Sequence, residues 1–231
     1  MKILGVIPAR GGSKGVKGKN YKLLNGIPLI VYTINTANKS NLSTVIVSTD
    51  DDKIISICKD YKIETPFKRP SHLATDSSTS IEVAKHALIS MEKINNTKYD
   101  AVMLLQPTSP FRTVNNINDS IKLLSNDKNA DSVISVVDVE GHHPARMKFI
   151  ENGILIDPEF CEKHENQNRQ ELEKMYIRNG AIYLTKRSIL LNGSYKGKKS
   201  LALEMKSENS INIDTESDFK LAEWVLNNRI K

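Results

Sequence analysis

The residues best suited to chemistry lie in a glycine-rich, basic loop close to the N-terminus. Residues 8–20 read PARGGSKGVKGKN and directly follow a short apolar run. Glycines allow positive φ and leave backbone N–H groups free to point at an anion. Arg10, Lys14 and Lys19 add the positive charge that a nucleoside triphosphate requires. The loop has neither the ending of a Walker A motif nor dinucleotide-fold spacing. It predicts a phosphate site, with a solvated basic turn as the alternative.

Two further groups of residues could act in a site. Gln106 stands where a later apolar run ends, just before Pro107. A polar side chain at the carboxyl end of a buried strand is placed to contact a substrate; the alternative is a strand-ending turn. His142 and His143 are adjacent and have no nearby carboxylate partner, which favours a turn or packing element over a metal site.

The elements that must position these residues alternate along the chain. Short apolar runs predict buried strands at residues 3–8, 44–49, 100–105, 132–139, 181–184 and 210–213. Helical spacing predicts helices at residues 28–38, 53–61, 80–94, 115–124 and 215–227. This alternation predicts an α/β fold: a Rossmann-like, mostly parallel sheet with helices on both faces. In such sheets ligands bind beyond the carboxyl ends of the strands, where the basic loop and Gln106 lie.

The pattern changes between residues 140 and 175, which are polar and contain most of the histidines. We interpret this segment as an excursion from the sheet, either a flap or a dimerisation arm. The expected organisation is a single domain over residues 1–231 with a protruding arm at about residues 140–175.

Composition excludes several classes of protein. The net charge is +6, but aromatic residues make up only 6% and do not interleave with the basic cluster at 14–22, so a nucleic-acid-binding surface is not expected. No apolar stretch approaches the roughly 18 residues of a membrane span. The N-terminal apolar run is too short for a signal peptide, and Cys58 and Cys161 do not suggest a disulfide framework. We expect a cytoplasmic protein.

Five segments together resemble the acylneuraminate cytidylyltransferases, the CMP-sialic acid or CMP-nonulosonic acid synthetases. They are Ile7–Gly15 with Lys19-Asn20, Arg69-Pro70 with Leu73-Ala74, Leu105–Arg112, Asn179–Tyr183 and Ile213–Thr215. They occur in family order and cover essentially the whole chain. The resemblance implies transfer of CMP from CTP to the anomeric hydroxyl of a sialic-acid-like nonulosonic acid, with release of pyrophosphate, for cell-surface glycan biosynthesis. It also implies Mg²⁺ or Mn²⁺ as cofactor and a homodimer in which the arm completes the partner's site.

The resemblance assigns roles to individual residues. For the nucleotide it implies Arg10, Ser13, Lys14 and Lys19 on the triphosphate, Asn20 facing the nucleotide, and Arg69 and Ser80 on the base and ribose. For the sugar acid it implies Gln106, with Arg169 pairing with the carboxylate across the dimer and Arg146 or Lys148 as a second cation. Arg10, Lys19 and Asp214 are the expected catalytic residues, and Asp214 with Asn212 the expected metal site.

Asn212 departs from the family pattern, which is Asp-Ile-Asp where this chain has Asn212-Ile213-Asp214. In a strand, positions 212 and 214 would share one face. An amide oxygen can ligate Mg²⁺ or a metal-bound water but adds no negative charge, so weaker metal affinity is expected. Three alternatives remain open: a synthetase for the eight-carbon acid Kdo, a nucleotide-binding homologue without turnover, and a nucleic-acid-binding protein.

Overall fold

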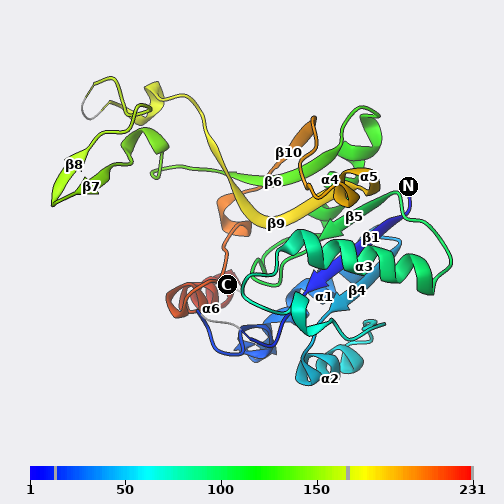
Figure 1. Cartoon of the computed structure of the whole chain (residues 1–231). Coiled ribbons are helices and arrows are strands. Elements are labelled where there is room, and N and C mark those ends of the chain that lie inside the picture. Colours follow the sequence, from blue (N-terminus) through cyan, green and yellow to red (C-terminus); the bar gives the residue numbers. More distant parts are fainter. Residues whose placement is uncertain (13–14, 165–166, 230–231) are drawn as a thin grey trace.

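A computed structural model of the chain describes residues 1–12, 15–164 and 167–229 (Figure 1). Its central sheet has six strands in the order β10-β6-β9-β5-β1-β4. They are β1 (Ile3–Pro8), β4 (Thr44–Ser48), β5 (Ala101–Leu104), β6 (Ser132–Asp138), β9 (Tyr176–Lys186) and β10 (Ser200–Glu204). Neighbouring strands are parallel except for β9, which runs antiparallel to both β5 and β6. The prediction of a mostly parallel sheet is confirmed.

Helices cover both faces of this sheet, as predicted. The covering helices are α1 (Leu29–Asn38), α2 (Asp52–Asp60), α3 (Ser80–Ile94), α4 (Val114–Asn126) and α5 (Arg187–Leu191), whereas α6 (Glu216–Arg229) packs in a separate, smaller core. Side chains alternate along β1: Ile3 and Ile7 join one core cluster with α1, α2 and α4, whereas Leu4 and Val6 join another with α3 and α5. Helix α3 begins at Ser80 because Thr79 and Glu82 form a capping box before it.

A third, smaller core fixes the basic loop beside the C-terminal part of the chain. Val16 of the loop is fully buried against Ile213 and Phe219, the latter from α6. The short hairpin of β2 (Leu23–Leu24) and β3 (Ile27–Pro28) contributes the buried Leu24. Two segments almost 200 residues apart in sequence are thereby held side by side by apolar packing.

The strand predicted at residues 210–213 is wrong, because this segment forms no strand. Backbone N–H groups in and directly after this segment donate to partners outside the sheet. The N–H of Ile213 donates to the carbonyl of Thr108 at 2.8 Å, and that of Asp214 donates to the Asp218 carboxylate at 3.0 Å. The outer strand of the sheet is instead β10, which the sequence pattern did not indicate.

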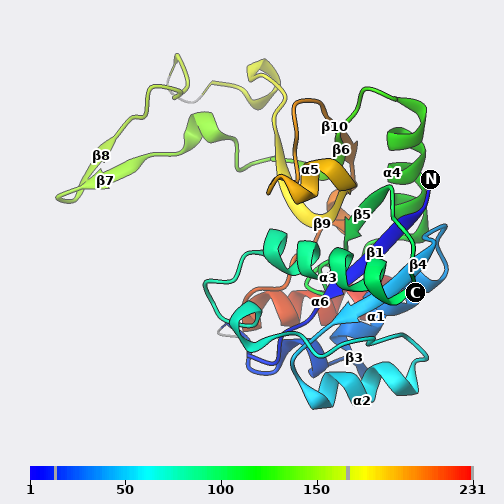
Figure 2. The same ribbon diagram turned by 45° about the vertical axis from the view of Figure 1, so that its right-hand side comes forward.

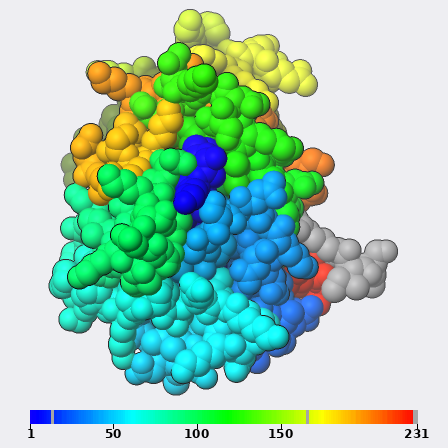
Figure 3. All heavy atoms as spheres, turned by 90° about the vertical axis from the view of Figure 1, so that its right-hand side faces the viewer, coloured from blue at the N-terminus to red at the C-terminus, as the bar shows by residue number. Residues whose placement is uncertain are grey.

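The segment between β6 and β9, residues 139–175, projects from the body as an arm (Figures 1 and 2). It carries the hairpin of β7 (Phe149–Glu151) and β8 (Ile154–Ile156). In the space-filling view its yellow atoms rise above the body (Figure 3). Ile150 and Leu155 on this hairpin are 74% and 68% exposed. None of the helices in the described part of the chain combines the length and apolar character that a membrane crossing requires.

Candidate active site

A cavity of about 550 Å³ opens beyond the carboxyl ends of β1 and β5. Its lining includes most of the residues predicted for the site, namely Arg10, Lys19, Asn20, Arg69, Ser80, Gln106, Asn212 and Asp214. Ser13 and Lys14, also predicted for the triphosphate, lie outside the described residues. The structure therefore brings together, from segments far apart in sequence, the groups expected around the nucleotide and the metal.

The basic loop is pressed closely against the acidic segment at 212–214. A Cβ atom on Gly15 would lie 2.1 Å from the backbone carbonyl oxygen of Asp214, a contact that only glycine permits. The loop then turns at Gly18, whose φ of 64° favours glycine. The amide of Asn20 closes the turn by donating to the carbonyl of Arg10 at 3.0 Å. Asn20 thus shapes the loop as well as lining the cavity.

The cations of the cavity are held in different ways. Arg10 forms an ion pair with Asp76 at 2.7 Å, and both side chains remain partly exposed. Arg69 is buried, and its guanidinium donates to the hydroxyl and the carbonyl of Ser48 at the end of β4. Burial lowers the pKa of Arg69 to about 10, the nearby Asp50 opposes that shift, and the charge of Arg10 adds to it. Asp76 had no assigned role in the sequence analysis.

Gln106 is positioned by Arg112, a residue that the sequence reasoning quoted within a motif but gave no function. Arg112 is buried and donates to the carbonyls of Gln106 and Ala181, each at 2.7 Å, and to the Thr33 hydroxyl at 3.3 Å. Burial lowers its pKa to about 9. A charged side chain directly after Pro-Phe in an apolar context was the available signal, because buried charges require partners.

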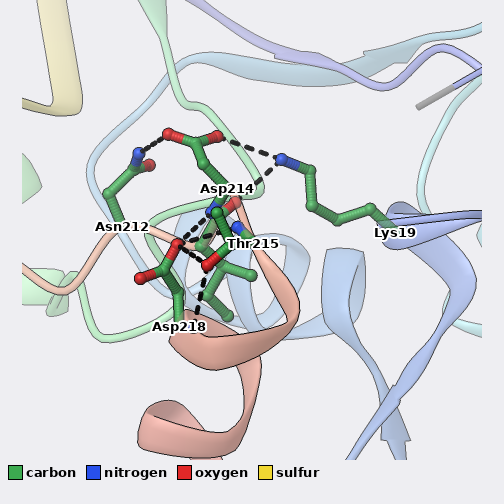
Figure 4. A network of polar contacts seen from close by, with 6 residues as sticks. Lys19, Asn212, Asp214, Thr215 and Asp218 are labelled. Carbon is green, nitrogen blue, oxygen red and sulfur yellow. Dashed lines mark hydrogen bonds and ion pairs between the residues drawn. The ribbon is translucent and has the colours of Figure 1, made fainter. Parts of the chain in front are cut away.

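The acidic segment forms a polar network at the start of α6 (Figure 4). The Lys19 ammonium lies 3.1 Å from one carboxylate oxygen of Asp214, and the Asn212 amide donates to the other. Asp218 accepts from the N–H groups of Asp214 and Thr215 at 3.0 and 2.8 Å. Its burial raises the pKa of that carboxyl, but these hydrogen bonds and the Lys19 charge outweigh burial and lower it overall. Although the segment is not a strand, positions 212 and 214 face each other.

This oxygen set is compatible with a magnesium ion that is bound jointly by protein and substrate. The Asn212 amide oxygen is buried and has no hydrogen-bond partner among the described residues. Within those same residues, no cluster of three or more His, Cys, Asp or Glu side chains is placed to hold a metal ion. Mg²⁺ is often held by one or two carboxylates together with substrate phosphates, and Asp214 supplies one carboxylate beside the basic loop.

The arm residues predicted for the sugar acid lie apart from this cavity. Arg146, Lys148 and Arg169 are absent from its lining in the described chain. Each has an acidic neighbour: Glu162 at 4.0 Å, Asp157 at 2.5 Å and Asp138 at 3.8 Å, respectively. His143 packs at the base of the arm with its Nε2 atom 2.9 Å from the carbonyl of Glu173. This agrees with the packing role expected for the histidine pair.

Comparison with known proteins identifies the family. The cytidylyltransferase family profile matches residues 4–220. The chain belongs to the cytidylyltransferase family. It is 37% identical to the CMP-N,N'-diacetyllegionaminic acid synthase of Legionella pneumophila, covering 98% of this chain and 97% of that protein. It is 34% identical to the post-translational flagellin modification protein B of Campylobacter coli, covering 97% and 94%.

This cytidylyltransferase also resembles longer proteins and more distant structures. It is 36% identical to the N-acylneuraminate cytidylyltransferase of Escherichia coli, covering 96% of this chain and 51% of that protein. A solved CMP:2-keto-3-deoxy-manno-octonic acid synthetase complexed with CTP superposes with a TM-score of 0.73 over 99% of this chain and 100% of that one. At 15% identity this second likeness concerns the fold. The predicted enzyme class, nucleotidyltransferase, is confirmed by the family and these relatives.

Proposed function

We propose that this protein is a cytoplasmic enzyme that transfers CMP from CTP to the anomeric hydroxyl of a sialic-acid-like nonulosonic acid and releases pyrophosphate. The observation that carries the proposal is the cavity lined jointly by the cations Arg10, Lys19 and Arg69 and by Gln106 and Asp214. A triphosphate requires such cations, and the sugar acid that carries the attacking hydroxyl requires a polar contact, which we assign to Gln106. The relatives named as CMP-nonulosonic acid synthases support the substrate class.

The nucleotide side of the reaction uses the loop after β1. Arg10 and Lys19, with Ser13 and Lys14 of the same loop, hold the triphosphate. Arg10 exchanges the Asp76 carboxylate for phosphate oxygens, which is possible because the pair is partly exposed. Attack of the sugar hydroxyl on the α-phosphorus then needs mainly positioning and charge neutralisation.

The proposed cofactor is Mg²⁺ or Mn²⁺, held by Asp214 with the amide oxygen of Asn212. When bound, the ion neutralises charge on the phosphate oxygens of the leaving group. Lys19 contributes a second positive charge from the loop, since its ammonium lies 3.1 Å from Asp214. The Asp218 carboxylate keeps the backbone of Asp214 in place by accepting its N–H.

The sugar-acid side requires a cation for the carboxylate, and the arm of a second subunit is the proposed source. The cavity cations Arg10, Lys19 and Arg69 are assigned to the nucleotide, while Arg169, Arg146 and Lys148 lie on the arm, outside the cavity lining. The exposed apolar residues of the β7–β8 hairpin, Phe149, Ile150, Ile154 and Leu155 among them, are 59%, 74%, 64% and 68% exposed. Exposed apolar surface of this kind marks an interaction site. We propose a homodimer in which Arg169 reaches the partner's Gln106 side.

The nine-carbon class is preferred to Kdo because the relatives at 36–37% identity are named for N-acylneuraminate and diacetyllegionaminate. The product would serve cell-surface glycan biosynthesis. Pyrophosphate release from CTP and Mg²⁺ with N-acetylneuraminate, legionaminate, pseudaminate and Kdo tests the proposal. We expect release with at least one nine-carbon acid and its loss in Arg10→Ala. Release with Kdo alone would contradict the substrate class, and no release from protein that binds CTP would favour a homologue without turnover.

A further inference from the structure

Both carboxylate oxygens of Asp214 are already engaged by donors of the protein itself (Figure 4). The Lys19 ammonium lies 3.1 Å from Oδ1 and also donates to the carbonyl of Ile213 at 2.8 Å. The Asn212 amide nitrogen donates to Oδ2. A cation that approaches this carboxylate therefore competes with a donor at each of its two oxygens.

The carboxylate cannot avoid these donors by moving with its backbone. The N–H of Asp214 is tied to Asp218 at 3.0 Å, and its carbonyl oxygen lies against Gly15. The side chain of Lys19 is 13% exposed and that of Asp214 is 65% exposed. Lys19 thus approaches from the cavity wall, while Asp214 faces the space where a triphosphate would lie. For a cation to take the place of a hydrogen bond at Asp214, the Lys19 ammonium or the Asn212 amide has to move.

The local charge also opposes a cation in the free protein. The Lys19 ammonium balances the charge of the Asp214 carboxylate, the Asp218 carboxylate is occupied by the N–H groups of Asp214 and Thr215, and Asn212 supplies a hydrogen-bond donor in place of a further charge. Mg²⁺ and Mn²⁺ need oxygen ligands, and a cation next to the Lys19 ammonium is repelled by it. A triphosphate reverses this balance because it brings negative charge and competes with Asp214 for Lys19.

We infer that Lys19 and Asn212 keep Asp214 closed to divalent cations until a triphosphate draws Lys19 away, so that metal and nucleotide bind as a coupled pair. This inference rests on the proposed function of the cavity. Release of Lys19 frees Oδ1 of Asp214. Rotation of the Asn212 amide then presents its oxygen, which is buried without a partner among the described residues. Coupling of this kind is reciprocal: the nucleotide tightens metal binding by the factor by which the metal tightens nucleotide binding.

The test measures binding of Mn²⁺ to the nucleotide-free protein by the loss of the free-ion electron paramagnetic resonance signal. Wild type is compared with Asp214→Asn, and with Asp119→Asn as a matched control, because Asp119 is an exposed carboxylate paired with Lys122. We expect equal Mn²⁺ uptake by all three. Asn212→Asp and Lys19→Gln each remove one closing donor, and we expect about tenfold or tighter uptake in both, abolished when Asp214→Asn is added.

A second measurement examines the coupling. CTP affinity is measured with and without Mn²⁺, and we expect a gain of about tenfold with the ion in wild type that Asp214→Asn largely loses. Mn²⁺ uptake by nucleotide-free wild type that Asp214→Asn removes and Asp119→Asn retains would overturn the inference. So would absence of any gain in folded Asn212→Asp and Lys19→Gln. These outcomes do not depend on turnover, so the inference can fail while pyrophosphate release still supports the proposed function.

Discussion

Replacement of Gly15 by alanine tests how closely the basic loop (residues 8–20) must approach the acidic segment (residues 212–214). The added Cβ would lie 2.1 Å from the carbonyl oxygen of Asp214. This neighbour is a backbone atom, and Asp218 and Lys19 hold the same residue from two other sides. It cannot swing aside as the end of a flexible side chain could. The loop and the acidic segment must therefore move apart in Gly15→Ala.

The size of the movement sets the expected effect. Carbon and carbonyl oxygen approach to roughly 3.3 Å at their closest, so the two backbones must separate by about 1 Å. Overpacking of this kind costs about 1–3 kcal/mol of unfolding free energy. A misplacement of about 1 Å at a catalytic site costs about 100-fold in rate. We expect both effects together, because the contact that is broken joins the triphosphate loop to the proposed metal ligand.

Gly12 provides the matched control in the same loop. Among the described residues, no atom lies within 4 Å of a Cβ atom built at Gly12, and its φ is not in the left-handed region. Gly12→Ala should therefore change the unfolding free energy by no more than about 0.5 kcal/mol. Initial rates of pyrophosphate release and thermal unfolding of the two variants are compared with wild type. If Gly15→Ala has the activity and stability of Gly12→Ala, the close approach and the reasoning built on it are refuted.

Three further predictions concern the interior, the pH dependence and the arm. Arg112→Met removes the guanidinium donor from the carbonyls of Ala181 and Gln106, so urea unfolding should show a loss of about 1–3 kcal/mol. A loss no larger than in the exposed Arg178→Met would contradict this. Burial, and then the charges of Arg69 and His72, lower the pKa of His86 in the folded protein. As the pH falls, the unfolded chain therefore binds a proton before the folded protein does, and stability falls as pH drops below about 6.5. In His86→Phe the melting temperature should depend less on pH between 5 and 7 than in wild type. When Arg10→Ala and Arg169→Ala subunits are mixed equally, about half of the dimers contain one of each. If Arg169 acts across the dimer, each such heterodimer has one intact site, so about a quarter of wild-type activity should return. Action within one subunit predicts no recovery.

The fold could be predicted from sequence wherever local pattern and packing agree. The apolar run at 3–8 predicted β1, and the helical spacing at 80–94 predicted α3 with the bounds that the structure shows. Within the run of acidic residues after β4, Asp51 is explained by capping, because it accepts from the N–H groups of Lys53 and Ile54 in the first turn of α2. Local rules of this kind operate within a few residues, so one sequence is enough to apply them.

The parts that sequence did not predict depend on contacts between distant segments. The segment at 210–213 has strand-like alternation, but the N–H of Ser210 donates to the Ser207 carbonyl and that of Ile213 donates to the Thr108 carbonyl, and the segment does not join the sheet. The role of Arg112 follows from three acceptors on three different segments. The pairing of Arg10 with Asp76 joins residues 66 positions apart. No local pattern encodes such contacts, because the topology alone brings the partners together.

The most direct test of the central claim follows the α-phosphate of CTP. The purified protein is incubated with Mg²⁺, a nonulosonic acid and CTP labelled on either the α- or the γ-phosphate, and the products are separated. The account predicts that α-label enters a CMP-sugar in amounts equal to the γ-label found in pyrophosphate, and that Arg10→Ala abolishes both. Transfer of γ-label to the sugar, or release of inorganic phosphate in place of pyrophosphate, would contradict nucleotidyl transfer at this site.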